Sequence, residues 1–133
     1  MTEQASRALP SRARIVVIGG GVGGTSVAYH LALSGERDVV LVDRSELTSG
    51  STFHSAGLVG QLRSDPTLTA MNRYSVELYS SLQQGGTPPG WVQCGSIRLA
   101  STQERWEEIQ RQAGWAASSG LEMSLISAAE AQE

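Results

Sequence analysis

A run near the start of the chain, GGGVGG at positions 19 to 24, has the composition of a phosphate-binding turn. Gly19, Gly21 and Gly24 satisfy the spacing GxGxxG. Glycine there permits a tight turn, close approach of the backbone to a pyrophosphate, and close packing of a helix on a strand. Val22 and Gly23 complete the turn, whose exposed N–H groups at a helix N-terminus attract phosphate oxygens. The spacing predicts a dinucleotide-binding site.

An acid lies at the distance from this turn that a ribose contact requires. Asp43 comes about 20 residues beyond Gly24 and is followed by Arg44. A carboxylate at the end of the second strand can bind the ribose hydroxyls of an adenosine. A glycine-rich turn that serves packing alone is the alternative, and the strand, turn and helix context disfavours it.

A histidine follows this unit in the run SGSTFHSAGLVG, residues 49 to 60. Small side chains around His54 let a backbone and a cofactor ring approach closely, and hydroxyls and amides can serve a pyrophosphate. The residues that we expect to share this site are Gly50, Ser51, Thr52, Phe53, Ser55, Ala56, Gly57 and Leu58. A loop histidine satisfied by backbone hydrogen bonds remains the alternative for His54.

The elements that must position these residues form a βαβ unit. The β-branched run over Arg14 to Ile18 predicts a strand buried on both faces of a parallel sheet, and Asp38 to Asp43 predicts a second one. Between them Val22 to Ser34 has helical spacing, and Gly35 supplies a C-terminal stop. The predicted class is α/β, a Rossmann-like unit with additional helices and short strands in an incomplete domain.

Two further helices are expected after this unit. Asp65 followed by Pro66 reads as an N-cap and first helical residue, and QQGGTPPG, residues 83 to 90, ends that helix. Its expected apolar stripe is Leu68, Met71, Ser75, Leu78 and Leu82. Ser101 with Glu104 has capping-box spacing for the other helix. The face expected to be buried there is Trp106, Ile109, Ala113 and Ala116.

Short extended segments complete the prediction. Trp91 to Ala100 is expected to be extended, and Met123 to Ile126 to form a short strand. Ser127 with Glu130 makes another capping box, and a helix that starts there without two full turns is marginal in water. We therefore expect residues 14 to 133 to be part of a domain truncated at its C-terminus. Residues 1 to 13 mix arginines with polar residues, and we expect them to be a disordered arm.

Composition limits the class of protein. The chain has 133 residues, 40% hydrophobic and 17% charged, with a net charge of −3, which is typical of a globular domain without a nucleic-acid or membrane partner. No run approaches the roughly 20 apolar residues of a membrane span. Cys94 has no cysteine partner, and no metal or nucleophile motif is evident. We expect a cytoplasmic protein, with the mitochondrial matrix as the alternative.

Two segments carry a more specific resemblance. DRSELTSGSTFHSAGLVGQLR, residues 43 to 63, and GWVQCGSIRLA, residues 90 to 100, resemble the dimethylglycine and sarcosine dehydrogenase family within the D-amino-acid-oxidase-like flavoproteins. The resemblance implies FAD, attached covalently through its C8 methyl group to His54. It also implies an N-methyl amino acid substrate that gives up a hydride to the flavin, leaving an iminium that hydrolyses to formaldehyde or meets tetrahydrofolate.

The resemblance leaves several points open. Asp43 and Arg44 stand where the family commonly has glutamate and then lysine or arginine, and Phe53 stands where tryptophan is common. The electron acceptor, oxygen or an electron-transfer protein, and the catalytic residues are unknown, and tetrahydrofolate would need domains beyond Glu133. One alternative is a non-catalytic regulatory protein like the pyruvate dehydrogenase phosphatase regulatory subunit, which lacks the histidine. The other is a nicotinamide-dependent dehydrogenase.

Overall fold

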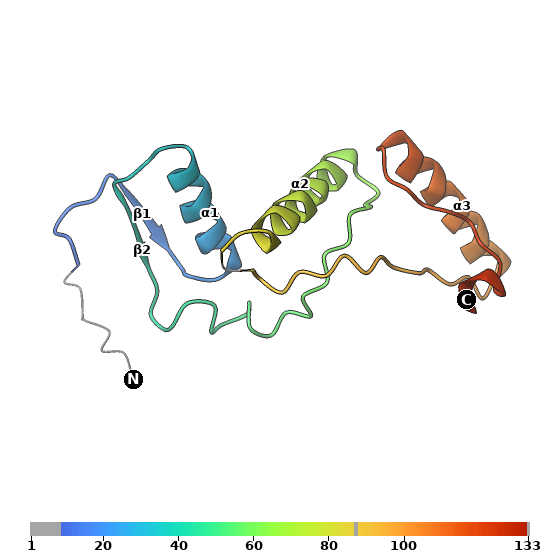
Figure 1. The fold of residues 1–133 in the computed structure, drawn as a ribbon, viewed down its shortest axis with the longest axis horizontal. Coiled ribbons are helices and arrows are strands. Elements are labelled where there is room, and N and C mark those ends of the chain that lie inside the picture. Colours follow the sequence, from blue (N-terminus) through green and yellow to red (C-terminus); the bar gives the residue numbers. More distant parts are fainter. Residues whose placement is uncertain (1–8, 87, 133) are drawn as a thin grey trace. The chain divides into compact units, whose positions relative to one another are not determined.

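The chain divides into two compact units, Met1–Gly57 and Leu58–Glu133. A computed structural model describes residues 9–86 and 88–132 (Figure 1). Of the arm expected over residues 1 to 13, residues 1 to 8 lie outside the described part, and residues 9 to 13 form neither helix nor strand.

The first unit contains the predicted βαβ arrangement. Strand β1 (Ile15–Ile18), helix α1 (Val22–Leu33) and strand β2 (Val39–Val42) follow one another (Figure 1). The strands pair in parallel, with Ile15 opposite Val39 and Ile18 opposite Val42. Helix α1 contacts both strands. The predicted crossover is confirmed, and each strand is shorter than expected because Arg14, Asp38 and Asp43 lie just outside the ladder.

The C-terminus of α1 ends as the sequence predicts. Ser34 is the C-cap, and Gly35 follows with φ +91°, in the left-handed region that favours glycine. The Gly35 N–H donates to Ala32 O and the Glu36 N–H to Leu31 O, each at 3.0 Å. This paired 5→2 and 6→1 pattern satisfies carbonyls that the helix leaves without partners.

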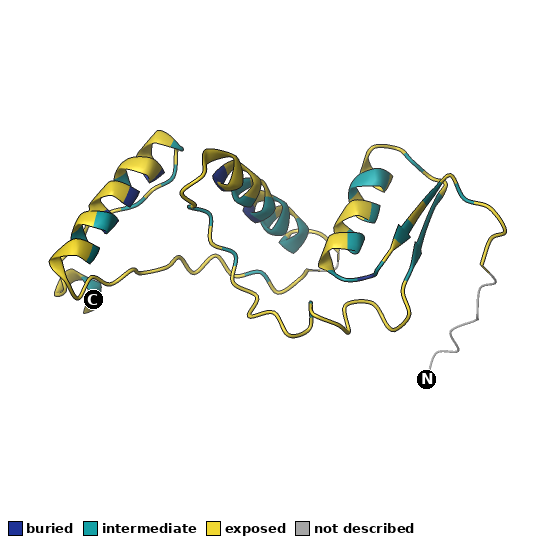
Figure 2. Ribbon diagram, turned by 180° about the vertical axis from the view of Figure 1, so that it is seen from behind, coloured by how far each residue is buried: buried dark blue, intermediate teal, exposed yellow. Residues whose placement is uncertain are grey.

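The expected burial of the strands on both faces is wrong for β1. Its burial alternates, with Ile15 and Val17 half-buried, whereas Val16 is 54% and Ile18 85% exposed (Figure 2). Within this unit α1 is the helix that lies against the strands, and a single helix covers only one face of a pleated sheet. The side chains of Val16 and Ile18 therefore face away from α1.

In the second unit, helix α2 (Pro66–Gln83) begins as predicted but turns a different face inward. The Asp65 carboxylate accepts a hydrogen bond of 2.9 Å from the Leu68 N–H, so Asp65 is the N-cap. Thr69 and Val76 are buried. Of the expected stripe, Leu68 and Met71 are 50% and 61% exposed, and the other three residues are half-buried: Ser75, Leu78 and Leu82. Figure 2 shows this buried face.

Polar contacts with the preceding segment select that face. Thr69 Oγ1 accepts from the Arg63 N–H at 3.0 Å and donates to Arg63 O at 3.1 Å. Asn72 Nδ2 donates to Gly60 O at 3.0 Å. These bonds hold the segment before α2 against Thr69 and Asn72, so the helix buries that side in place of the one that hydrophobicity alone predicts.

Helix α3 (Gln103–Ser118) begins one residue later than the capping box predicts. Thr102, not Ser101, is the N-cap, because its Oγ1 accepts from the Arg105 N–H at 3.2 Å. The predicted inner face is confirmed at its centre: Ile109 and Ala116 are 4% and 1% exposed. Ser101 and Thr102 both carry the hydroxyl that an N-cap needs. The path of the backbone decides that Thr102 is the one that faces the free N–H groups of the first turn.

Within the described residues, the extended segments of the second unit form no β-sheet pairing. The strand expected at Met123 to Ile126 is wrong, and residues 91 to 100 form no ladder. Arg98 instead donates to Oε1 of buried Gln112, whose amide donates to Glu108 at 2.7 Å. A strand needs a neighbour for its N–H and C=O groups, whereas this segment is held through side chains and through the Trp91 N–H, which donates to Gln83 Oε1 at 2.8 Å. The last capping box is confirmed: Ser127 N–H and Oγ lie 2.7 and 2.8 Å from Glu130, before a short 3₁₀ turn, η1 (Glu130–Gln132).

Candidate functional site

The glycine turn between β1 and α1 is shaped by backbone geometry at two of its positions. Gly19 has φ +105°, a conformation that side chains with a Cβ atom rarely adopt. A Cβ atom on Gly24 would overlap the carbonyl oxygen of Gly19. The turn therefore brings the first residues of α1 directly against the end of β1, which aims the helix N-terminus at the space beyond the strands.

The N-terminus of α1 has no cap of its own. Gly21 is the N-cap and offers no side chain, and the Thr25 N–H makes the first helical bond, to Gly21 O at 3.0 Å. The Val22 N–H donates instead to Thr52 Oγ1 at 2.9 Å, 30 residues further along the chain. By helix geometry the next N–H groups, of Gly23 and Gly24, have no acceptor within the helix. They are suited to an anion.

Asp43 connects the end of β2 to the glycine turn. Its Oδ2 accepts from the Gly20 N–H at 2.6 Å, and its Oδ1 accepts from the Ser45 N–H at 2.8 Å. These two backbone bonds, that from Gly20 first, hold the pKa of the Asp43 carboxyl below its ordinary value. Each carboxylate oxygen keeps a further acceptor position, so an ionised Asp43 can still accept from ribose hydroxyls.

The segment after β2 is held against the turn and then folds on itself. Thr48 has a positive φ of 64°, and its N–H donates to Gly20 O at 2.9 Å. From Gly50 onward the chain makes successive tight turns, with Phe53 N–H bonded to Gly50 O at 3.1 Å and His54 N–H to Ser51 O at 3.2 Å. The His54 ring is exposed and lies edge-on to the Phe53 ring at 5.6 Å between centroids.

A pocket of about 380 Å³ lies between the glycine turn and this segment. Its volume is in the range of small-molecule sites. The residues that line it are Gly21, Asp43, Arg44, Ser45, Thr48, Ser49, Gly50, Ser51 and Thr52. Ionised Asp43 and cationic Arg44 therefore share one wall with several hydroxyls.

The structure gathers part of the site that the sequence predicts. Of the expected residues, Gly21, Asp43, Arg44 and the run from Gly50 to Thr52 line the pocket. The others do not line it: Gly19, Val22, Gly23 and Gly24 shape the turn, Phe53 to Gly57 follow on the exposed loop, and Leu58 belongs to the second unit.

Sequence reasoning missed four residues of this site. Ser45, Thr48 and Ser49 line the pocket, and buried Gly20 donates to Asp43. A Cβ atom on Gly20 would overlap the Leu47 side chain and lie 3.3 Å from Asp43 Cβ. The one signal for Gly20 was its place between Gly19 and Gly21 in GGGVGG, which makes three adjacent glycines. The GxGxxG spacing itself does not require glycine at that position.

The arrangement fits the phosphate and ribose portion of a dinucleotide. The helix N-terminus and the open N–H groups favour negative charge, and no atom lies within 4 Å of a Cβ built on Gly23, so the approach is open. The acid beside the turn fits ribose hydroxyls. This combination binds and orients; among these residues no side chain has the partners of an activated nucleophile.

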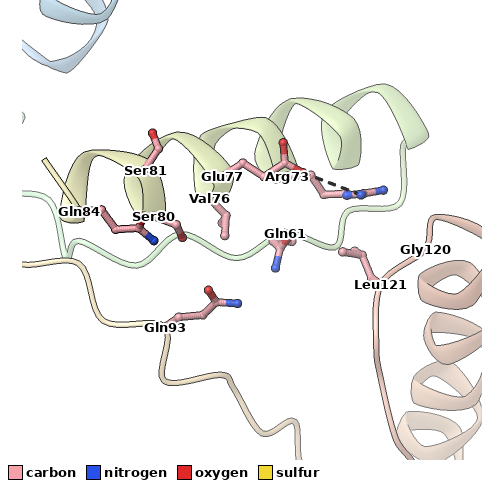
Figure 3. A pocket seen from close by; sticks show the side chains of 10 residues that line it. All are labelled: Gln61, Arg73, Val76, Glu77, Ser80, Ser81, Gln84, Gln93, Gly120 and Leu121. Carbon is pink, nitrogen blue, oxygen red and sulfur yellow. Dashed lines mark ion pairs between the residues drawn. The ribbon is translucent and has the colours of Figure 1, made fainter.

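A second hollow, of about 490 Å³, lies within the second unit (Figure 3). Arg73 and Glu77 of α2 form an ion pair of 3.9 Å on its wall, and Arg73 Nη1 also donates to Ser119 O at 2.8 Å. Half of the residues that line it are uncharged and polar: Gln61, Ser80, Ser81, Gln84 and Gln93. None of the residues predicted to carry chemistry lines it.

A metal site and a membrane-spanning helix are both absent from residues 9–86 and 88–132. No three or more His, Cys, Asp or Glu side chains gather there in a way that suits a metal ion. No helix in the same residues combines the length and the apolar character needed to cross a membrane.

Comparisons with known proteins give a matching family profile and several similar proteins. The profile of the family described as "FAD dependent oxidoreductase" matches residues 14–133. The chain is 49% identical over 102 residues to "Dimethylglycine dehydrogenase, mitochondrial" of Rattus norvegicus, covering 76% of this chain and 12% of that protein. It is 39% identical over 127 residues to "Sarcosine dehydrogenase, mitochondrial" of Homo sapiens, covering 94% of this chain and 14% of that protein.

A third relative has a different description. Over 110 residues the chain is 43% identical to "Pyruvate dehydrogenase phosphatase regulatory subunit, mitochondrial" of Mus musculus, covering 82% of this chain and 12% of that protein. The chain thus spans 12 to 14% of the length of these curated relatives.

Proposed function

Because the chain belongs to the family of FAD-dependent oxidoreductases, we propose that residues 14 to 57 hold the ADP portion of FAD in an enzyme that oxidises an N-methyl amino acid. The observation that carries the proposal is the 2.6 Å hydrogen bond from the Gly20 N–H to Asp43, which joins the phosphate turn to the ribose-binding acid. Family membership favours FAD over the nicotinamide alternative.

In this proposal each residue has a limited task. The N–H groups of Gly23 and Gly24 bind the pyrophosphate, with the positive end of α1 behind them. Asp43, ionised and already oriented by two backbone N–H groups, accepts from the ribose hydroxyls. Arg44 lies on the same pocket wall and supplies a positive charge near the phosphates.

His54 is proposed to attach the flavin covalently. The bond joins an imidazole nitrogen, in its unprotonated form, to the C8 methyl carbon of the ring. Forming this bond would release the proton of the other imidazole nitrogen, and one methyl C–H would give up a proton and two electrons. The bound flavin would take up both protons and both electrons, and the electron acceptor of the complete protein would then reoxidise it. The exposed position of His54 on a tight turn leaves its ring accessible for this bond.

The substrate is proposed from the relatives whose names state one. Dimethylglycine and sarcosine are N-methyl amino acids, and two of the similar proteins are named as their dehydrogenases. The chemistry that a bound FAD supplies is acceptance of a hydride from the N-methyl carbon. The electron acceptor, oxygen or a carrier protein, and any use of tetrahydrofolate belong to the complete protein.

A regulatory role is the second candidate, because one relative is named as a phosphatase regulatory subunit. The residue that separates the two candidates is His54, because covalent attachment of the flavin needs its imidazole. A protein that keeps the covalent attachment point is the one expected to use the flavin for chemistry.

The test uses the full-length protein, denatured in acid and digested. We expect flavin absorbance to stay with the peptide that contains His54, with the corresponding added mass, and to be released as free FAD in His54→Ala. Free FAD from the wild type would remove the covalent link and keep the flavoprotein. Absence of flavin from the purified wild type would contradict the whole proposal.

A further inference from the structure

The N-terminus of α1 is capped by a residue from outside the helix. A serine, threonine, asparagine or aspartate at the N-cap would normally accept a hydrogen bond from one of the first N–H groups. Gly21 occupies that position and has no side chain, and Thr52 Oγ1 supplies the missing acceptor to the Val22 N–H at 2.9 Å. Thr52, in the loop after β2, therefore caps the N-terminus of α1.

The same hydroxyl restricts the residue at position 21. A Cβ atom built on Gly21 would lie 3.0 Å from Thr52 Oγ1, tighter than nearly all real Cβ contacts. A side chain at this position would therefore require Thr52 to shift by a few tenths of an ångström, independently of any phosphate. Gly21, Val22 and Thr52 form a close-fitting contact among the chain's own atoms.

The contact fixes the place of His54 because little freedom remains between the two residues. His54 lies two residues after Thr52, within tight turns closed by the bonds Phe53 N–H to Gly50 O and Ser55 N–H to Thr52 O, each 3.1 Å. On the other side Thr48 N–H is bonded to Gly20 O at 2.9 Å. Two separate bonds therefore hold this loop to the glycine turn.

We propose that Thr52 is a positioning residue for His54: its hydroxyl holds the turn that carries the histidine on the N-terminus of α1 before FAD binds. The inference rests on the proposed function of His54. Holding a nucleophile near its target accelerates bond formation by lowering the freedom that must be lost. Thr52 still has its own O–H proton, since it acts as acceptor toward Val22, and can donate it toward the pocket that it lines.

The test compares Thr52→Val, which keeps the shape and removes the acceptor, with Thr52→Ser, which keeps the hydroxyl. Full-length apoprotein is mixed with excess FAD, and the acid-stable flavin is followed with time. Loss of one hydrogen bond should slow attachment in Thr52→Val by roughly three- to tenfold, and Thr52→Ser should restore most of the rate. Thr67→Val, the same change at an exposed residue of α2, is the control and should match the wild type.

Amide hydrogen exchange of the apoprotein supplies a readout that needs no flavin. The amides of His54 and Ser55 should exchange roughly three- to tenfold faster in Thr52→Val and at the wild-type rate in Thr52→Ser. Wild-type attachment and exchange rates in Thr52→Val would overturn the inference. If the wild type attaches no flavin, the proposed role of His54 fails, and the exchange experiment alone decides whether Thr52 positions the turn.

Discussion

The two units hold their elements in place with different kinds of hydrogen bond. In the first unit the bonds around the glycine turn join residues more than 20 positions apart, Gly20 with Asp43 and Val22 with Thr52, through backbone N–H groups and short side chains. In the second unit the helix starts are set locally, by Asp65 and Thr102, each bonded to an N–H three residues later.

Contacts between distant parts of the second unit depend on long side chains. Arg73 reaches Ser119 O at 2.8 Å, and Arg98 reaches Gln112, while α2 and α3 do not pack on each other within the described residues. A short side chain leaves little room for adjustment, whereas an arginine can follow its partner over several ångströms. We therefore expect the first unit to respond more sharply to the change of a single atom.

The largest expected effect comes from adding one methyl group to the first unit. Gly24→Ala forces the new Cβ against the Gly19 carbonyl, so α1 must move away from β1. Overpacking of this kind costs roughly 1 to 3 kcal/mol, and more where backbone atoms must move. We expect the purified full-length protein to retain less than about a tenth of the wild-type FAD.

The neighbouring glycine provides the matched control. No atom lies within 4 Å of a Cβ built on Gly23, and alanine is preferred over glycine in a helix by about 0.5 to 1 kcal/mol. Gly23→Ala should therefore leave α1 on β1, with hydrogen exchange of the β1 amides no faster than in the wild type. Equal exchange in Gly23→Ala and Gly24→Ala would contradict the close packing of α1 on β1.

An intermediate effect is expected where a long side chain of the second unit is shortened. Arg73→Met removes the charged donor to the carbonyl of Ser119, the C-cap of α3. Hydrogen bonds from charged groups contribute about 1.5 kcal/mol or more, so the amides of Gly120 and Leu121 should exchange about tenfold faster. Amide exchange in the full-length protein, followed by mass spectrometry, measures this.

Glu77→Gln isolates the other interaction of Arg73. The ion pair between them is 3.9 Å long and its side chains are 42% and 68% exposed. Exposed pairs of this kind contribute little, so we expect less than about a twofold change in the same amides. A larger effect of Glu77→Gln than of Arg73→Met would contradict the role of the Arg73–Ser119 bond in holding the end of α3.

A smaller effect than that of Arg73→Met is expected at the start of α3. Thr102→Ala removes the cap from the Arg105 N–H, which costs about 1 kcal/mol and should speed exchange of the Arg105 and Trp106 amides about fivefold. Ser101→Ala removes a hydroxyl that caps nothing there and should change exchange less than twofold. The reverse order would restore Ser101 and Glu104 as the capping box.

Sequence patterns predicted the elements well where local chemistry decides them. Each strand and the helix of the βαβ unit follow from patterns within a short stretch of residues. The same holds for the end of α1 at Gly35 and for the start of α2 at Asp65. Local patterns failed where two choices were equivalent or a distant partner was needed. Ser101 and Thr102 are both hydroxyl residues, and the strand expected at Met123 to Ile126 has no neighbour in the described part of the chain.

For the site, the amino-acid sequence by itself determined the glycine turn and the acid at the end of β2. Glycine spacing and strand ends are properties of short stretches, which steric limits on φ and the helix N-terminus make recognisable. Only the tertiary structure decided that Gly20 donates to Asp43 and that Thr52 caps α1. Those bonds join atoms 23 and 30 residues apart, and no local rule orients a donor toward an acceptor that the chain must fold to bring near.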